Sequence, residues 1–271
     1  GARYYKGHNM ARAKVIIFLY NRLFDPLIQS NFWLYIQDYL DDPNRNVDFH
    51  LVTYENSELP LTDEQKQLVA KWQSQGLEWS TLTWHPGFGG HQKFTDIFNG
   101  LRLVFRLRAK GMRHILTLGS VAGTFAYIYA RLLFMRLYLY QFEPHSELSR
   151  DAGAWPAESL QFKISALLEK RAACFATVIA SGTKFMRERV KDHWRAKGTF
   201  IKIPTVANDR KFHFDPVIRD EMRAELGLTD KNNVIYYPGK FHGLYYGVET
   251  AWLFRWMLDC DPLTRMLIVT P

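Results

Sequence analysis

Short apolar runs alternate with segments of helical length along most of this sequence. Seven such runs lie between Lys14 and Pro204, and stretches long enough to be crossover helices separate them. Parallel strands need crossovers of this length, because a tight hairpin joins only antiparallel strands. The pattern therefore predicts an α/β fold with a mostly parallel sheet that is complete within this part of the chain.

Capping and turn residues set the expected limits of these elements. Thr62 and Gln65 have capping-box spacing at the start of one helix, and Gly76 closes it. The segment from Phe142 to Glu158 is expected to be a long loop. The expected strands are 14–20, 47–54, 77–82, 114–118, 136–141, 177–180 and 199–203. The expected helices are 26–40, 62–75, one ending at 110, 122–134, 159–171 and 184–195.

The remaining residues predict part of a second domain. A helix begins at Asp215-Pro216 and ends before Gly227, and strands at 234–237 and 266–270 flank a helix at 248–258. A sheet of two parallel strands cannot be covered on both faces by so few helices. We therefore expect domains at 14–205 and 206–271, with the second cut short, although this segment could instead extend the first.

The charge balance favours anionic partners. The chain of 271 residues has 35 basic and 27 acidic side chains, a formal net charge of +8. Phosphorylated ligands, a membrane face or nucleic acid would all suit that surplus. Only two cysteines are present, which excludes a disulfide scaffold and a four-cysteine zinc module and favours a reducing compartment.

The positive charge is concentrated in one stretch. No acidic residue lies between Asp96 and Glu143. The stretch is either a solvated helix face or a basic, aromatic surface that lies on anionic lipid. A transmembrane span at 121–140 is disfavoured, because two arginines would lie inside it. The cations of the stretch are Arg102, Arg106, Arg108, Lys110, Arg113, Arg131 and Arg136.

Ligands of parallel α/β sheets bind beyond the carboxyl ends of the strands, so the loops there are the candidate sites. Gly119 and Ser120 follow the fourth strand and open a helix, where backbone N–H groups can face an anion. Glu143, His145 and Ser146 follow the fifth strand and bring together a carboxylate, an imidazole and a hydroxyl. Either loop could also be an ordinary turn with its polar groups satisfied locally.

Two later loops could hold a phosphate. Ser181 follows the sixth strand beside a helix cap, and capping alone would explain it. Gly239 and Lys240 follow the strand at 234–237, with Gly243 and Gly247 close behind. A lysine among glycines at a strand end is well placed to bind a phosphate, and a solvent-exposed turn lysine is the alternative.

Several familiar site motifs are absent from the sequence. It has no G-x-G-x-x-G fingerprint after the first strand and no P-loop, which disfavours NAD chemistry and P-loop nucleotide hydrolysis. It has no G-x-S-x-G elbow for a serine hydrolase and no H-E-x-x-H or clustered cysteines for zinc. We therefore expect neither a cofactor nor a metal site.

Together these loops resemble the group 1 retaining glycosyltransferases of the GT-B fold. The segment Ile203-Pro204-Thr205-Val206-Ala207-Asn208 resembles that family's I-P-N-G-V-D motif, and Glu225-Leu226-Gly227 resembles the end of its R-x-E-L-G helix. Tyr236-Tyr237-Pro238-Gly239-Lys240 looks like the strand and turn with the donor-phosphate cation. Glu143-Pro144-His145-Ser146 resembles the acceptor-side loop of the N-terminal domain.

The resemblance implies two Rossmann-like domains that transfer a sugar from a nucleotide-sugar donor, with retention and without a metal. The acceptor would be a glycan or lipid-linked glycan, and the protein would be cytoplasmic and peripheral on the inner face of the membrane, with no nucleic acid as partner. The implied catalytic residues are Glu143 and His145. The implied donor-binding residues are Ser181, Gly239, Lys240, Gly243 and Gly247, and the acceptor-side residues are Gly119, Ser120 and Ser146.

Three departures from the family pattern bear on the donor site. Lys240 stands where the family usually has arginine, and Tyr246 stands where a second cation is expected. The family's Glu-x7-Glu pair would lie beyond Pro271. Two other functions stay open: a GT-B sugar-nucleotide epimerase, and a non-enzymatic basic α/β module that binds membrane or nucleic acid.

Overall fold

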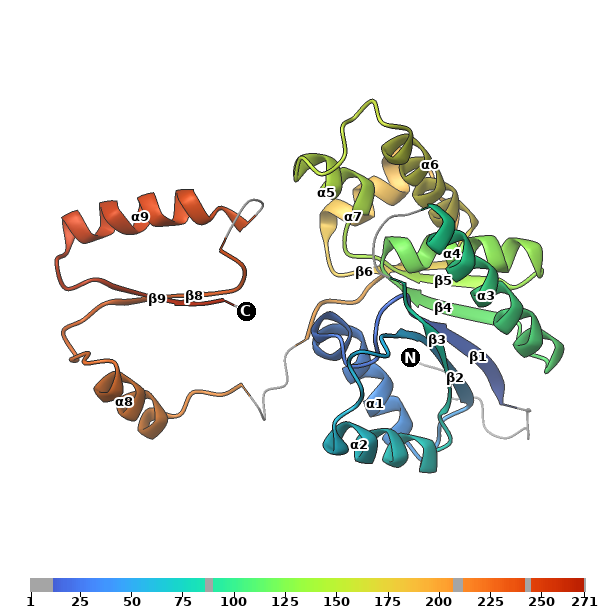
Figure 1. Ribbon diagram of the computed structural model, residues 1–271, viewed down its shortest axis with the longest axis horizontal. Helices are drawn as coiled ribbons and strands as arrows, with labels where there is room; N and C mark the ends of the chain where they lie inside the picture. Colours follow the sequence, from blue (N-terminus) through green and yellow to red (C-terminus); the bar gives the residue numbers. More distant parts are fainter. Residues whose placement is uncertain (1–11, 86–89, 207–211, 242–244, 271) are drawn as a thin grey trace, which may run out of the picture. The chain divides into compact units, whose positions relative to one another are not determined.

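The computed structural model of this protein describes residues 12–85, 90–206, 212–241 and 245–270. The chain forms two compact units (Figure 1). The first comprises residues 1–148 and 157–207, and the second comprises residues 149–156 and 208–271. The functional division into domains 14–205 and 206–271 stays a prediction.

The first unit contains a seven-stranded sheet in which every neighbouring pair of strands is parallel. The order across the sheet is β3-β2-β1-β4-β5-β6-β7. All seven strands lie within a residue or two of the expected ranges, so the predicted α/β fold is confirmed. The strands are β1 (Ala13–Phe18), β2 (Val47–Glu55), β3 (Glu78–Thr83), β4 (His114–Leu118), β5 (Arg136–Tyr140), β6 (Val178–Ser181) and β7 (Thr199–Lys202).

Helices connect consecutive strands. The predicted capping box is present, because Thr62 Oγ1 accepts the N–H of Gln65 while the Gln65 side chain accepts the N–H of Thr62. The α-helices of this part are α1 (Trp33–Asp41), α2 (Asp63–Ser74), α3 (Gly90–Ala109), α4 (Ser120–Leu132), α5 (His145–Asp151), α6 (Leu160–Phe175) and α7 (Lys184–Glu188). The π-helical turns are η1 (Ile28–Phe32) and η2 (Arg189–His193).

The sheet is buried on both faces, and β1 shows why its sequence is apolar without a break. Alternate side chains point to opposite faces of a strand. Ile16 and Phe18 belong to the core under α3, α4 and α6, whereas Ile17 and Leu19 belong to the core under α1 and α2. All four have no exposed surface. Figure 1 shows the two layers of helices on either side of the strands.

Three expected elements differ from the structure. The segment 142–158 is not a continuous loop, because α5 lies within it. Glu169 of α6 accepts hydrogen bonds from Ser146 N and Oγ and so stabilises the start of α5. Glu169 is distant from α5 in the sequence, so local sequence patterns do not reveal this interaction. The helix expected at 26–40 contains the π-helical turn η1 near its start, and the one at 184–195 is divided into α7 and η2.

The second unit contains α8 (Pro216–Glu225), β8 (Val234–Pro238), α9 (Gly247–Cys260) and β9 (Arg265–Val269). Asp215 caps α8 through Oδ1, which accepts the N–H groups of Val217 at 2.9 Å and Ile218 at 3.2 Å. β8 and β9 pair in parallel and α9 connects them, as the sequence predicts for a Rossmann-like unit.

Candidate functional site

The order of the strands defines a topological switch point at the carboxyl edge of the sheet. β1 has β2 on one side and β4 on the other, so the chain reverses its direction of travel across the sheet between β1 and β4. Ligands of open α/β sheets bind at such a switch point. Tyr20 follows β1 there, and Gly119 follows β4.

The turn after β4 is fixed to its neighbours by hydrogen bonds. Gly119 has a φ of 83°, which glycine adopts without strain. Its N–H donates to the carbonyl oxygen of Tyr140 at 2.8 Å, which ties the turn to the end of β5. Ser120 is buried, and its Oγ donates to the carbonyl oxygen of Glu143 at 2.8 Å. The Ser120 hydroxyl therefore holds the next loop in position.

That next loop presents Glu143 and His145 at the same edge. Glu143 is exposed and His145 is half-buried. Partial desolvation raises the pKa of the Glu143 carboxyl, and burial lowers the pKa of the His145 imidazole. His145 is therefore neutral at pH 7, and a neutral imidazole can accept as well as donate a hydrogen bond. The two groups can bind a sugar hydroxyl or transfer a proton.

Two of the serines predicted as site residues are buried within the fold. Ser146 is 1% exposed, and its Oγ donates to Glu169 Oε2 at 2.5 Å. Burial raises the pKa of Glu169, although its hydrogen bonds from Ser146 oppose this shift. Ser181 has no exposed surface, and its Oγ accepts the N–H of Thr183 at 3.4 Å. Both hydroxyls thus contribute to local structure, and a ligand would have to displace these contacts.

The predicted donor loop lies at the carboxyl end of β8. Gly239 has a φ of 138°, and its N–H donates to the carbonyl oxygen of Val269 at 2.8 Å. Lys240 is exposed. The hydroxyl of Tyr237 lies 3.1 Å from the carbonyl oxygen of Lys240 and 2.6 Å from that of Tyr245, so it holds both ends of the loop. Gly243 lies outside the described residues.

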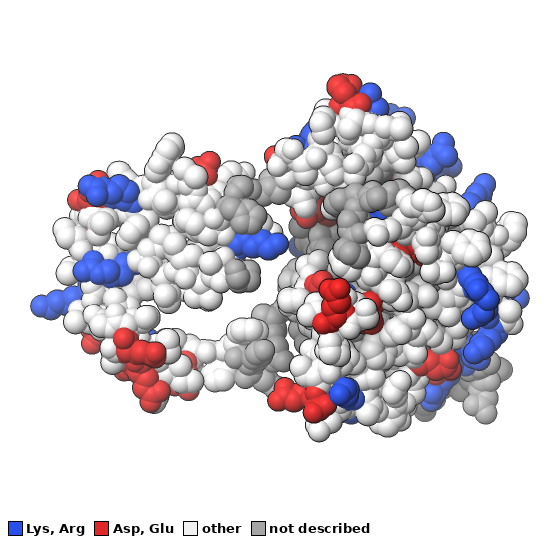
Figure 2. Space-filling model, viewed as in Figure 1, with Lys and Arg blue, Asp and Glu red and all other residues white. Residues whose placement is uncertain are grey.

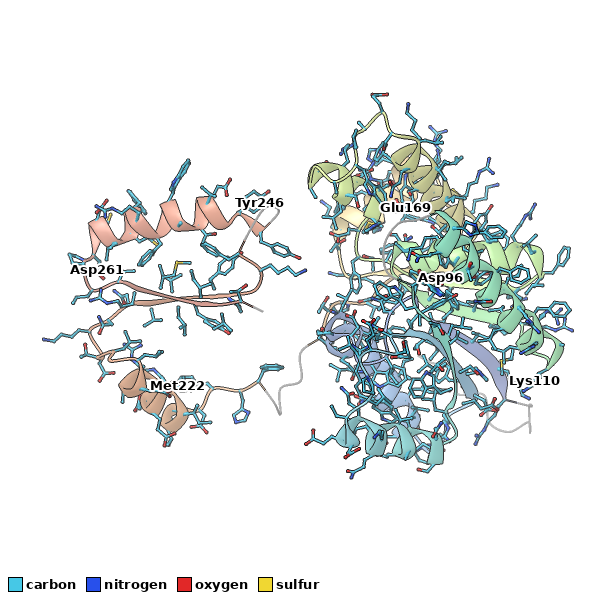
Figure 3. The ribbon with its side chains drawn as sticks, viewed as in Figure 1. Asp96, Lys110, Glu169, Met222, Tyr246 and Asp261 are labelled. Atoms are coloured by element: carbon cyan, nitrogen blue, oxygen red, sulfur yellow. The ribbon has the colours of Figure 1, made fainter. Side chains whose placement is uncertain are left out.

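The start of α9 follows this loop directly. Gly247 is buried in the first turn of the helix. Tyr246 precedes it with a φ of 54°, and Figure 3 labels it at that end of the helix. Tyr246 stands where the resembling family has a second cation, and Lys240 stays the residue predicted to bind a donor phosphate.

A second polar group lies at the switch point and was not found from the sequence. It consists of Tyr20, His85, Lys93 and Asp96, and we call it the Asp96 cluster. Figure 3 labels Asp96. Asp96 has no exposed surface. His85 Nδ1 lies 2.5 Å from Asp96 Oδ1, and the Tyr20 hydroxyl donates to Asp96 Oδ2. Lys93 Nζ donates to the Tyr20 hydroxyl at 2.6 Å and to the carbonyl oxygen of His85 at 3.0 Å.

Two further tyrosines fix α3 beneath this cluster. The Tyr54 hydroxyl donates to the carbonyl oxygen of Asp96 at 2.7 Å, and the Tyr129 hydroxyl donates to that of Ile97 at 3.0 Å. Burial raises the pKa of both phenols, which therefore stay protonated as donors. Gly100 makes room for them, because a Cβ there would lie 2.3 Å from Tyr129 Oη and 2.6 Å from Tyr54 Oη.

The sequence did carry one signal for the Asp96 cluster. Asp96 marks the start of the acid-free stretch in the sequence, and His85 follows a predicted strand. The rule about carboxyl ends applies equally to β1 and β3, and it points to Tyr20 and His85, which follow those strands. The pairing with Asp96 depends on where α3 packs, and no local pattern shows that. Over the described residues, no group of three or more His, Cys, Asp or Glu side chains could hold a metal ion.

Comparisons with known proteins show which solved structures share this fold. No protein-family model matches the sequence, and no curated protein matches it. Similar solved structures include UGT2 of Phytolacca americana complexed with UDP-2fluoro-glucose and pterostilbene, with a TM-score of 0.55 and 12% identity over 97% of this chain and 72% of that one.

Two other similar structures come from bacteria. Sucrose-phosphate synthase from Thermosynechococcus elongatus has a TM-score of 0.60 and 15% identity over 95% of this chain. A putative UDP-N-acetylglucosamine 2-epimerase from Listeria monocytogenes has a TM-score of 0.57 and 13% identity over 95% of this chain. This chain spans 62% of the length of each. At such identities the likeness concerns the fold, and this chain has an α/β fold of the GT-B type.

Proposed function

We propose that this chain belongs to a glycosyltransferase that moves a sugar from a nucleotide-sugar donor to a hydroxyl of a glycan or lipid-linked glycan. The observation that carries the proposal is the GT-B fold together with polar loops at the carboxyl ends of its strands. Residues 14–205 would form the acceptor side and residues 206–271 part of the donor side. The similar UGT2 structure contains UDP-2fluoro-glucose, which supports a nucleotide-sugar donor.

Each loop has a chemical role in this proposal. Lys240 would stabilise the charge that develops on the leaving diphosphate, with Gly239 and Gly247 leaving room for it. Glu143 and His145 would hold the reacting sugar from the first unit. Gly119 would form the turn that places Ser120 next to the loop, and the Ser120 hydroxyl would keep Glu143 in place. Transfer with retention and without a metal follows the family resemblance and is part of the proposal.

The epimerase is the second candidate, because one similar structure is a putative UDP-N-acetylglucosamine 2-epimerase. The whole protein should be incubated with UDP-glucose, UDP-N-acetylglucosamine and GDP-mannose, and the products separated. A new glycosidic bond would support the transferase, and NMR of the anomeric proton would show retention or inversion. An epimerised nucleotide sugar without a new bond would support the epimerase. No turnover of any donor would contradict both.

An anionic membrane surface is the proposed partner of α3. Phe94, Phe98 and Phe105 form an exposed stripe on this helix, with 57 to 69% of each residue exposed. Arg102 and Arg106 lie exposed beside the stripe. Figure 2 shows Lys and Arg side chains gathered on that side of the first unit. Aromatic side chains with flanking cations are typical of surfaces that lie in the headgroup region, so we propose a cytoplasmic, peripheral protein on the inner face.

No helix among the described residues is long and apolar enough to cross a bilayer.

Replacing Arg102 and Arg106 by serine is expected to weaken binding to phosphatidylglycerol vesicles roughly 30-fold, because each cation near an anionic surface contributes about 1 kcal/mol. Cosedimentation at physiological salt measures the change. Arg108 is kept because its Nε donates to the carbonyl oxygen of Leu133 at 3.3 Å.

Lys66→Ser with Lys71→Ser is the matched control, since it removes two positive charges from α2, on the other face of the sheet. This variant should bind vesicles like the wild type. If both double variants bind equally well, the basic stretch is only a solvated helix face.

The pH dependence of turnover tests the role of His145. Burial lowers the pKa of His145, so its neutral form should persist below pH 6.5 and be lost only as the pH falls further. We expect the acid limb of kcat/KM for the donor to lie below pH 6.5 and to disappear in His145→Gln. A limb that persists in His145→Gln and disappears in Glu143→Gln would assign it to Glu143 instead.

A further inference from the structure

The Asp96 cluster has no role in the function proposed so far. Asp96 is a carboxylate without exposed surface, and burying a charge is costly unless donors surround it. Here the Tyr20 hydroxyl and His85 Nδ1 bind its two oxygens, and Lys93 Nζ lies 3.7 Å from Oδ2. Polar networks of this kind in a ligand-binding region are candidates for functional sites.

The geometry fixes the tautomer of His85. The Asp96 carboxylate can only accept, so Nδ1 of His85 carries the proton and donates it. In the neutral ring, Nε2 then has a free lone pair. The His85 side chain is 32% exposed, and no hydrogen bond to its Nε2 is present within the described residues. The ring is thus held on one side and available on the other.

The surroundings of the ring determine which ligand it can bind. Lys93 Nζ lies 3.7 Å from Asp96 Oδ2 and offers the buried carboxylate a cation. Lys93 Nζ also lies 5.0 Å from the centre of the Tyr20 ring and 5.7 Å from that of Trp84, and both aromatic rings favour a cation at this position. The atom of this cluster that is left for a ligand is His85 Nε2.

The cluster also lies close to the proposed acceptor loops. Tyr20 follows β1 at the switch point, and its ring packs against Phe125 of α4 with 4.7 Å between ring centres. α4 is the helix that begins at Ser120, whose hydroxyl holds Glu143. Both the cluster and the Glu143 loop therefore contact α4 near the carboxyl edge of the sheet.

We propose that His85 Nε2 accepts a hydrogen bond from a hydroxyl group of the sugar acceptor, and that Asp96 is the positioning residue that fixes the His85 ring. This inference rests on the proposed glycosyl transfer and specifies its acceptor site. An Nε2 lone pair accepts from an O–H donor, so the group that we place there is a hydroxyl of the acceptor sugar.

The test uses the whole protein labelled with ¹⁵N-histidine and a panel of methyl hexopyranosides as acceptor probes. At least one sugar of the panel should shift the Nε2 resonance of His85, whereas inorganic phosphate should not. In a transfer assay with that sugar, His85→Gln should raise the acceptor KM about three- to tenfold, because Asp96 does not hold the glutamine carbonyl oxygen at the position of Nε2 and the hydrogen bond is weakened or lost. Donor hydrolysis without acceptor should keep its rate.

The Asp96→Asn variant tests whether Asp96 positions the His85 ring or only fills space in the fold. An amide can turn its NH₂ toward the ring, so the variant should change the ¹⁵N pattern of His85 to a mixture of tautomers and raise the acceptor KM in the same direction. His114→Gln is the matched control, because His114 begins β4 at the opposite edge and pairs with the Tyr138 hydroxyl at 3.0 Å. It should leave the acceptor KM unchanged.

The outcomes separate this inference from the function on which it rests. A wild-type protein that turns over no nucleotide sugar contradicts the proposed transferase. If the wild-type protein transfers sugar but His85→Gln leaves the acceptor KM unchanged, the assignment of His85 to the acceptor site is wrong. An Nε2 resonance that no sugar of the panel shifts also overturns it. His85→Gln keeps the test decisive if Asp96→Asn does not fold, because His85 is partly exposed.

Discussion

Replacing Lys240 by alanine is expected to lower kcat/KM for the nucleotide-sugar donor by about ten- to a few-hundredfold in the whole protein. A hydrogen bond to a charged group contributes roughly 1.5 to 3 kcal/mol, and its contribution grows as charge develops on the leaving diphosphate. Lys240 follows β8 directly, beside Gly239 with its φ of 138°. Tyr246 stands where the resembling family has a second cation, and its phenol has no positive charge with which to share this role.

The stability of the Lys240→Ala protein should match that of the wild type. Lys240 is exposed and forms no ion pair with another described residue. An exposed turn lysine of this kind contributes little to folding. Thermal melts therefore distinguish a lost phosphate contact from a damaged fold. A melt that moves by several degrees would mean that the loop depends on this side chain.

Two further variants complete the measurement. Lys240→Arg should keep most of the activity, because it restores the cation that the resembling family usually has. Lys231→Ala removes another exposed lysine of the second unit and should leave kcat/KM unchanged. Steady-state kinetics on all three proteins decide the assignment. Wild-type donor turnover in Lys240→Ala would show that the phosphate lies elsewhere.

The order of the elements could be predicted from the sequence because it depends on local signals. Continuous apolar runs such as Lys14 to Tyr20 mark strands that are buried on both faces, and crossover lengths require them to be parallel. Helix ends could be placed where a side chain caps them, as Thr62 and Asp215 do. Those signals lie within a few residues of the element that they define.

The features that were missed depend on distant residues. At the start of α5, Ser146 donates its hydrogen bonds to Glu169, which is more than 20 residues away in the chain. The candidate serines show the same limitation, since sequence alone did not reveal that Ser146 and Ser181 would be buried. The Asp96 cluster combines side chains from the ends of β1 and β3 and from α3. Such a set becomes visible only after the helix is packed on the sheet.

Gly100→Ala is expected to destabilise the protein by about 1 to 3 kcal/mol, the usual cost of overpacking a core. The added Cβ would lie 2.3 Å from Tyr129 Oη and 2.6 Å from Tyr54 Oη, closer than nonbonded atoms can approach. Alanine gains about 1 kcal/mol of helix propensity over glycine, which offsets only part of a clash of this size. Thermal unfolding should show a Tm lower by roughly 2 to 12 °C.

The clash cannot be relieved cheaply, because both tyrosines are essentially unexposed and their hydroxyls bind carbonyl oxygens of α3. Gly100→Ala should therefore cost far less in a Tyr54→Phe, Tyr129→Phe background, where the clashing oxygens are gone. An equal cost in both backgrounds would assign the effect to something other than these contacts. Asp96 lies one turn before Gly100, so displacement of α3 should also loosen the carboxylate that holds His85. We expect Gly100→Ala to raise the acceptor KM even at temperatures where the protein is fully folded.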